Sequence, residues 1–236
     1  MKIFIPFLLI CLSSLAGKAL FENRPESAVA YVVELEVLGI HRVLGPMKSF
    51  LADLAWVEVF RHHRSYQYEL VDEKTRWICA LQPHVVKGWD YLSWNLSFNL
   101  FAEAGENLKK KEKWLRRGIE QLDLGLSLNP DSSRLLYSKA VTFFIRSKDP
   151  QVFSILRSIC REDPHAVAAN LGVRSRMLEL GSWPESTMVI GMLQKAGRYQ
   201  QAIAACIELE NRFPNQKRTL ENLIKLFTKE KNAGSQ

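Results

Sequence analysis

Residues that interrupt regular structure or cross-link a chain are scarce in this sequence. Its 236 residues include only 9 prolines, 12 glycines and 4 cysteines. So few cysteines, with no two of them at metal-ligand spacing, exclude a disulfide framework and a structural zinc site. No stretch is dominated by serine, glycine or glutamine, so we expect disorder only at the two ends.

Motifs of known catalytic chemistry are also missing. The sequence has no Gly-x-Ser-x-Gly elbow, no His-Glu-x-x-His, no phosphate-binding glycine loop and no nucleophilic cysteine with a placed histidine. Glu58 and His62 are four residues apart and could share a metal, but no third ligand stands at a suitable spacing. We therefore expect a protein that is not an enzyme and needs neither a metal nor another cofactor.

What is present is a normal globular composition with an excess of positive charge. Hydrophobic residues make up 47% of the chain and charged residues 24%, which allows a substantial core. The formal net charge of +7 favours anionic partners such as lipid headgroups, acidic proteins or nucleic acid. Charge alone does not choose among these partners.

The first 16 residues have the layout of a signal peptide. Lys2 precedes an apolar run over residues 3–12, and the small residues Ser14 and Ala16 offer a cleavage point after Ala16. The apolar stretch of about 14 residues would span only about 21 Å as a helix, which is short for a membrane. We predict export to the periplasm or the outer face of the inner membrane, and nucleic acid becomes an unlikely partner. An uncleaved anchor and a buried first helix are the alternatives.

A helix ending followed by proline recurs along the chain. It occurs at Leu81-Gln82-Pro83, Leu128-Asn129-Pro130, Glu162-Asp163-Pro164 and Arg212-Phe213-Pro214. Because proline cannot continue a helix, a repeated stop marks the end of a repeated helical unit. The spacings are 47, 34 and 50 residues, and we interpret the longer two as one unit plus insertions. The insertions would be the charged stretch 102–111 and an extra helix over 165–180.

The last of these units resembles the tetratricopeptide (TPR) repeat. Gly197-Arg198-Tyr199 would turn the chain between two helices, and the small residue Ala202 would let the paired helices pack closely. The apolar positions that carry the resemblance are Val189, Ile190, Leu193, Ala196, Ile203, Cys206 and Leu209. The family commonly has a small residue and an aromatic one where this chain has Ile190 and Leu193.

A second resemblance covers about a third of the chain. It is to a group of uncharacterised bacterial envelope TPR proteins, and it implies a helical repeat scaffold with no catalytic residue. The motifs that carry it are 51–56 (Leu-Ala-Asp-Leu-Ala-Trp), 81–83, 94–99 (Trp-Asn-Leu-Ser-Phe-Asn), 114–119 (Trp-Leu-Arg-Arg-Gly-Ile) and 128–130.

These patterns predict an all-α fold, a right-handed α-solenoid of about four divergent TPR-like helix pairs. After the signal segment 1–16 we expect a helical lead-in over 17–46, the repeat domain over 47–230 and a disordered tail over 231–236. A C-terminal capping helix would carry Leu220, Leu223, Ile224 and Phe227 on one face.

Two asparagines are the first candidates for binding a protein partner. Asn95 and Asn99 are four residues apart, so they share one face of a predicted first helix. The TPR resemblance implies that first helices line a concave groove, where paired amides could bind a partner's backbone or terminal carboxylate. Alternatively, both amides satisfy backbone groups within the fold. Trp94 and Phe98 lie beside them, either in core packing or in the same binding surface.

A basic cluster is the candidate for an anionic surface. It comprises Lys109, Lys110, Lys111, Lys113, Arg116 and Arg117 around Trp114. A solvated helix face is one interpretation, and contact with anionic lipid headgroups or an acidic envelope polymer is the other. We therefore expect an adaptor in the bacterial envelope that binds a protein, with a peripheral membrane or cell-wall factor as the alternative. The sequence predicts neither the partner's identity nor the oligomeric state.

Overall fold

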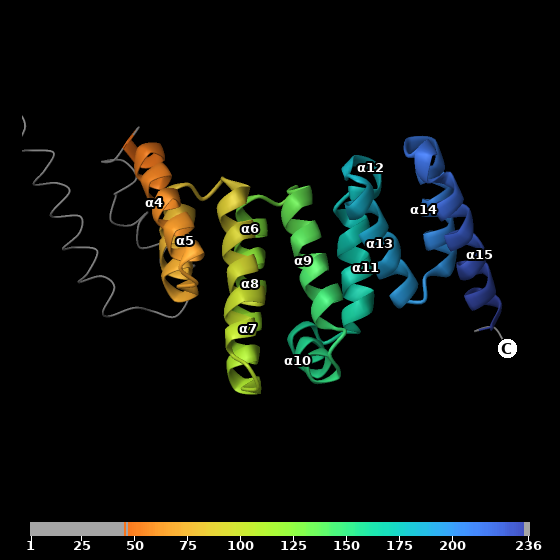
Figure 1. The fold of residues 1–236 in the computed structure, drawn as a ribbon, viewed down its shortest axis with the longest axis horizontal. Helices are drawn as coiled ribbons and strands as arrows, with labels where there is room; N and C mark the ends of the chain where they lie inside the picture. Colours follow the sequence, from red (N-terminus) through yellow and green to blue (C-terminus); the bar gives the residue numbers. More distant parts are fainter. Residues whose placement is uncertain (1–44, 46, 234–236) are drawn as a thin grey trace, which may run out of the picture. The chain divides into compact units, whose positions relative to one another are not determined.

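The computed structural model describes residue 45 and residues 47–233, and most of them form helices (Figure 1). No strand occurs in this part of the chain, so the prediction of an all-α protein is confirmed for it. The predicted signal segment, and the lead-in apart from Gly45, lie outside the described residues. No helix in the described range is both long and apolar enough to cross a membrane.

The first two helices form an antiparallel pair. Helix α4 (Met47–Arg64) and helix α5 (Tyr68–Leu81) are joined by a short turn and pack along their lengths. Gln82, just after α5, donates to the Ser49 hydroxyl at the start of α4 with an N···O distance of 3.3 Å. The end of one helix therefore lies beside the start of the other.

The second pair has a first helix in three parts. Helix α6 (Val86–Trp94) continues without a break into the π-helix η1 (Asn95–Leu100) and the short α7 (Phe101–Glu103). The chain returns through α8 (Leu108–Leu128), whose Asn107 cap accepts the Lys110 N–H at 3.0 Å. The predicted insertion 102–111 is thus not a separate loop. It is largely taken up by the end of the first helix, a turn and the start of α8.

The third group departs from the predicted helix pair. Helix α9 (Ser133–Arg146) is followed by α10 (Pro150–Cys160), α11 (Pro164–Arg174) and α12 (Met177–Leu180). The extra helix predicted over 165–180 is present as α11 and α12. However, α9 packs far more extensively on α11 than on α10. The inserted helix α11 is therefore the main packing partner of α9, in the place where the repeat pattern predicts α10.

The last three helices match the expected order. A capping box between Ser182 and Glu185 starts α13 (Trp183–Lys195), and Gly197, with a φ of +70°, makes the left-handed turn into α14 (Tyr199–Arg212). Ala202 is fully buried, as its small size predicts. After η2 (Pro214–Gln216), α15 (Lys217–Ala233) packs on α14.

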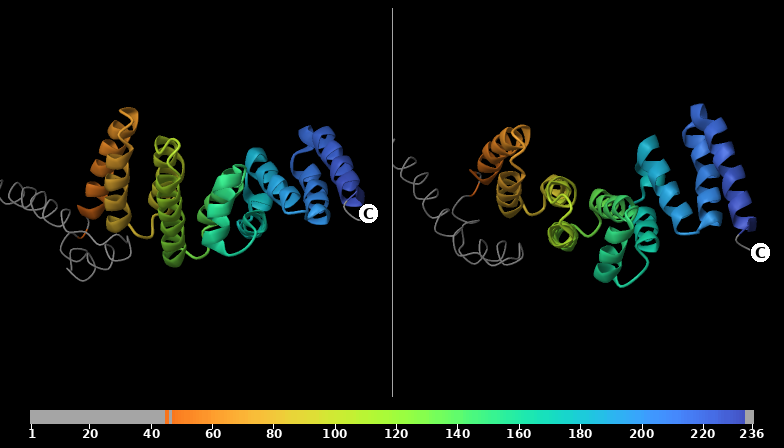
Figure 2. Two further views of the ribbon diagram at one scale, coloured as in Figure 1. Left: turned by 90° about the horizontal axis from the view of Figure 1, so that it is seen from below. Right: turned by 60° about the horizontal axis from the view of Figure 1, so that its bottom comes forward.

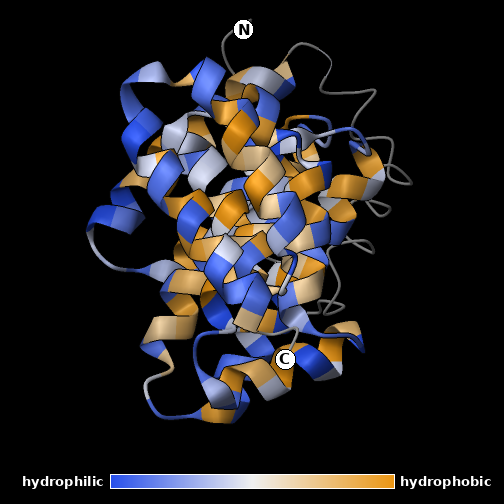
Figure 3. Ribbon diagram, turned by 90° about the vertical axis from the view of Figure 1, so that its right-hand side faces the viewer, coloured by the Kyte–Doolittle hydropathy of each residue, from blue (hydrophilic) through white to orange (hydrophobic). Residues whose placement is uncertain are grey.

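Helices close in sequence are close in space throughout the described range. The two views of Figure 2 show each helix beside its sequence neighbours, and the packing contacts agree. Figure 3 shows hydrophobic and hydrophilic residues alternating along the helices, which is the pattern of helices with one apolar face. A continuous buried apolar core runs from Phe101 to Phe227, and a smaller one joins α4 to α5.

Candidate functional site

The π-helix η1 changes the hydrogen bonding of the first helix in the second pair. At its end the Phe101 N–H donates to the carbonyl groups of Leu96 and Phe98, and passes over the carbonyl of Ser97. In a regular α-helix the Ser97 carbonyl would be the acceptor for Phe101. Single π-turns of this kind often occur at functional sites, because they free a backbone group and turn side chains out of register.

Arg146, from the last turn of α9, uses this carbonyl. Its Nε donates to the Ser97 oxygen at 3.0 Å. The guanidinium carbon lies 4.4 Å from the centre of the Phe98 ring and 4.0 Å from that of Phe101. Desolvation in this half-buried position lowers the pKa of Arg146 from its ordinary value, although Asp149 acts in the opposite direction. The cation therefore lies within cation–π distance of two aromatic rings.

Trp94 extends this arrangement to the surface. Its ring is stacked on that of Phe98, with centroids 3.9 Å apart and an interplanar angle of 13°. Trp94 is 48% exposed, whereas Phe101 is buried. We call Trp94, Phe98, Arg146 and Phe101 the stacked row. It brings two successive first helices together, and its outer end is an exposed aromatic ring.

The two candidate asparagines, Asn95 and Asn99, differ in how deeply they are buried. Asn95 is only 1% exposed, and its Nδ2 donates to the Tyr68 carbonyl at 2.9 Å. Its side-chain oxygen accepts a hydrogen bond from Asn99 at 3.1 Å. Asn95 thus satisfies a backbone group within the fold, as the alternative interpretation proposed. Of the four candidates, Trp94 has the largest exposed surface and Asn99 and Phe98 are half-buried.

The basic cluster lies at the start of α8, and only part of it is free of neighbours. Three lysines, Lys109, Lys110 and Lys113, are exposed. The others have partners. Arg116 binds Glu112 at 2.7 Å and donates to the Ser158 hydroxyl at 2.9 Å.

Three cations of the cluster lie over aromatic rings, and one of them is the exposed Lys113. Arg117 and Lys113 lie 5.3 and 5.0 Å from the centre of the Trp114 ring. Lys111 lies 5.5 Å from the ring of Phe101, so it adds positive charge at the inner end of the stacked row. Lys109 and Lys110 are therefore solvated without a ring contact, Lys113 is exposed but lies over a ring, and Arg116 is paired with Glu112.

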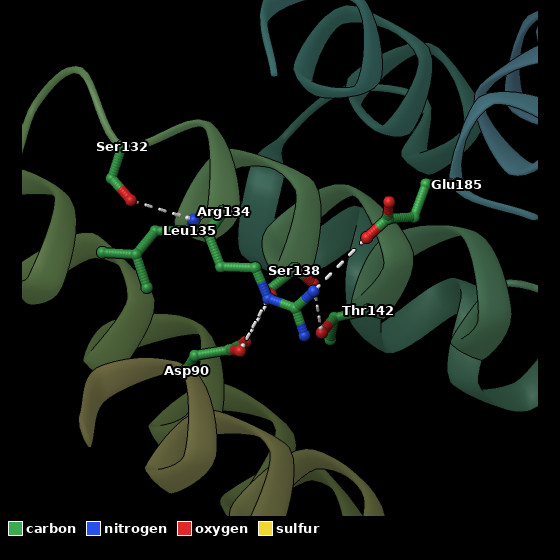
Figure 4. Close-up of polar contacts among 7 residues, drawn as sticks. All are labelled: Asp90, Ser132, Arg134, Leu135, Ser138, Thr142 and Glu185. Atoms are coloured by element: carbon green, nitrogen blue, oxygen red, sulfur yellow. Dashed lines mark hydrogen bonds and ion pairs between the residues drawn. The ribbon is translucent and has the colours of Figure 1, made fainter. Parts of the chain in front are cut away.

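A network of charges links three first helices (Figure 4). Arg134 on α9 lies between Asp90 on α6 and Glu185 on α13, with N···O distances of 2.8 and 3.5 Å. Asp90 also accepts the Ser138 hydroxyl. Hydrogen bonds from Ser182 hold the pKa of Glu185 below its ordinary value. All three charges are matched within the fold, so this network ties helices together.

Sequence reasoning missed two features of the surface. One is Arg146, which lies 48 residues beyond Phe98 and has no local pattern that would connect it to the aromatic residues. The other is an apolar stripe on α4, where five large side chains are exposed at roughly helical spacing. They are Met47, Phe50, Leu54, Val57 and Phe60. The i, i+3, i+4 spacing of these residues is visible in the sequence, but it does not say which side of α4 faces outward.

No group of three or more metal-ligating side chains comes together in the described residues. Glu58 instead pairs with Lys74 at 3.1 Å, and His62 shares a hydrogen bond with Gln67 at 2.7 Å. Comparison of the chain with protein-family models, curated proteins and solved structures gives no match. Membership of the TPR family therefore stays a prediction.

Proposed function

We propose that this protein is a non-catalytic scaffold that binds a segment of a protein partner on the surface formed by successive first helices. The observation that carries the proposal is the stacked row. An exposed tryptophan, supported from behind by Phe98 and a cation, is a rigid apolar anchor of the kind that dominates protein interfaces.

The finer architecture that fits this role is a right-handed solenoid of TPR-like pairs. Its support is the recurring proline stops, the order of short-turned helix pairs and the buried Ala202. Helical solenoids present extended surfaces on which partner segments bind. The signal-like layout of the first residues in the sequence is the support for proposing that this scaffold works in the bacterial envelope.

A displayed library of short random peptides, selected on the full chain, tests the proposal. We expect enrichment of peptides whose binding falls by roughly 30-fold in Trp94→Ala, because truncating a central aromatic anchor costs about 2 kcal/mol. Leu226→Ala is the matched control, since Leu226 is 44% exposed on the distant α15. Equal binding by both variants and the wild type would contradict the proposal.

A second candidate, binding of an anionic surface by the basic cluster, is favoured by the three exposed lysines. Two of them, Lys109 and Lys110, lie in the first turn of α8, where no acidic residue balances the positive end of the helix dipole. The same experiment separates the two functions. Contacts with exposed lysines weaken steeply as salt rises, whereas an apolar contact on Trp94 is comparatively insensitive.

A further inference from the structure

Arg146 differs from the other well-placed arginines in its partners. Arg134, Arg116 and Arg176 each form an ion pair with a carboxylate at 2.8, 2.7 and 2.7 Å. Arg146 forms no ion pair within residues 47–233, and its only hydrogen bond there is the one from Nε to the Ser97 carbonyl. A guanidinium carries five N–H donors, so the four on its terminal nitrogens have no acceptor in this part of the chain.

Asp149 acts electrostatically on Arg146 but forms no ion pair with it. Asp149 caps α10, and its carboxylate accepts the Gln151 N–H at 2.9 Å. Lys111 lies over the ring of Phe101, the same ring that Arg146 contacts, so a second positive charge is present at this end of the row. The inner end of the stacked row is therefore a half-desolvated region of positive charge. An anion that entered it would recover electrostatic energy that screening by water removes at a fully exposed site.

The geometry also selects the shape of the anion. The guanidinium lies close to the rings of Phe98 and Phe101 and is bound to Ser97 through Nε, so its terminal N–H groups are the donors left for a ligand. A planar guanidinium edge matches a planar carboxylate through two parallel hydrogen bonds. Trp94, at the other end of the row, offers an apolar surface to a neighbouring side chain.

From this arrangement we infer that the bound partner segment carries an aspartate or glutamate, whose carboxylate pairs with Arg146 while an adjacent apolar side chain packs on Trp94. The inference rests on the proposed function of the stacked row and names the chemistry of its partner. It adds Arg146 as the residue that selects among apolar segments, since an uncharged segment would leave this cation unpaired.

A double-mutant cycle tests the pairing. Peptides selected on the full chain are synthesised with amidated ends, so that side chains supply their only carboxylates. Each acidic residue is then changed to its amide. We expect one such change to weaken binding to the wild type by roughly 10-fold or more, the scale of a charge-assisted hydrogen bond. In Arg146→Gln the same change should alter binding by less than about 2-fold.

Lys148→Gln is the matched control, because it removes a nearby exposed charge that lies over a different ring, that of Phe144. It should respond to the peptide change as the wild type does. Thermal unfolding checks each variant. If Arg146→Gln does not fold, Arg146→Lys carries the cycle, since it keeps the charge but loses the two parallel N–H groups and should bind more weakly.

Two negative results are distinguishable. Peptides that bind in a Trp94-dependent manner, but whose acid-to-amide changes have equal effects in the wild type and Arg146→Gln, would overturn the acidic partner and leave the scaffold in place. Failure to obtain any Trp94-dependent peptide would overturn the proposed function, and the inference with it.

Discussion

At the scale of single residues, the approach of η1 to α8 is set by the absence of a side chain at Gly118. A Cβ atom added there would lie 2.0 Å from the Ser97 Oγ and 3.2 Å from the Ser93 carbonyl oxygen. The Ser97 hydroxyl is buried and has no hydrogen-bond partner among the described residues. The π-turn that holds Arg146 therefore depends on a glycine on the neighbouring helix.

Gly118→Ala should lower the free energy of unfolding by about 2 to 3 kcal/mol, as overpacking of a close contact does. Ser97→Ala alone should change it by less than about 0.5 kcal/mol, because the lost hydroxyl has no partner. In the double variant at least about 1 kcal/mol should be recovered, since the closest contact is gone. Urea unfolding followed by circular dichroism measures all three. Strictly additive effects would show that the two residues do not meet as described.

At the scale of elements, most boundaries follow from local chemistry that the sequence displays. The helix ends before the proline stops and the left-handed turn at Gly197 lie where the repeat pattern places them, whereas the Asn107 cap falls inside the predicted insertion 102–111. Long-range packing was less predictable. The proline spacing could not show that α11 would displace α10 from α9, because both helices have apolar faces and short connections. The π-turn was invisible for a related reason, since it depends on contacts with Gly118 and Arg146.

The start of α13 shows how an element end becomes sensitive to pH. The carboxylate of Glu185 accepts the Ser182 N–H at 2.7 Å and the Ser182 hydroxyl at 2.9 Å, which lowers the pKa of Glu185. A carboxyl whose folded-state pKa is lowered stabilises the fold above its unfolded-state pKa. That contribution is lost as the pH falls through the folded-state value.

Glu185→Ala should therefore cost about 1 kcal/mol of unfolding free energy at pH 7, the usual value of a helix cap. The difference from the wild type should shrink toward zero as the pH falls below about 4 and the wild-type carboxyl gains its proton. Glu208→Ala, on the exposed face of α14, provides the comparison. A difference that stays constant from pH 7 to acid would show that the charge of Glu185 does not contribute.

At the scale of the whole molecule, the described residues form a series in which each helix packs mainly on its near neighbours. In such a series a binding site can form where two successive first helices meet, and the helices at the two ends of the series need not take part. The partner-binding prediction named some of the residues of the stacked row, and whether they bind a partner stays a prediction. Trp94 and Phe98 belong to the stacked row, whereas Asn95 is internal and Arg146 could not be predicted from its position in the sequence.

Hydrogen exchange, measured by mass spectrometry on the full chain with and without a selected peptide, tests the central claim most directly. A partner segment on the stacked row should slow exchange in α6, η1 and the last turn of α9, and leave α14 and α15 unchanged. Slowed exchange confined to the first turn of α8, or to the apolar stripe of α4, would contradict the account and move the binding site to that surface.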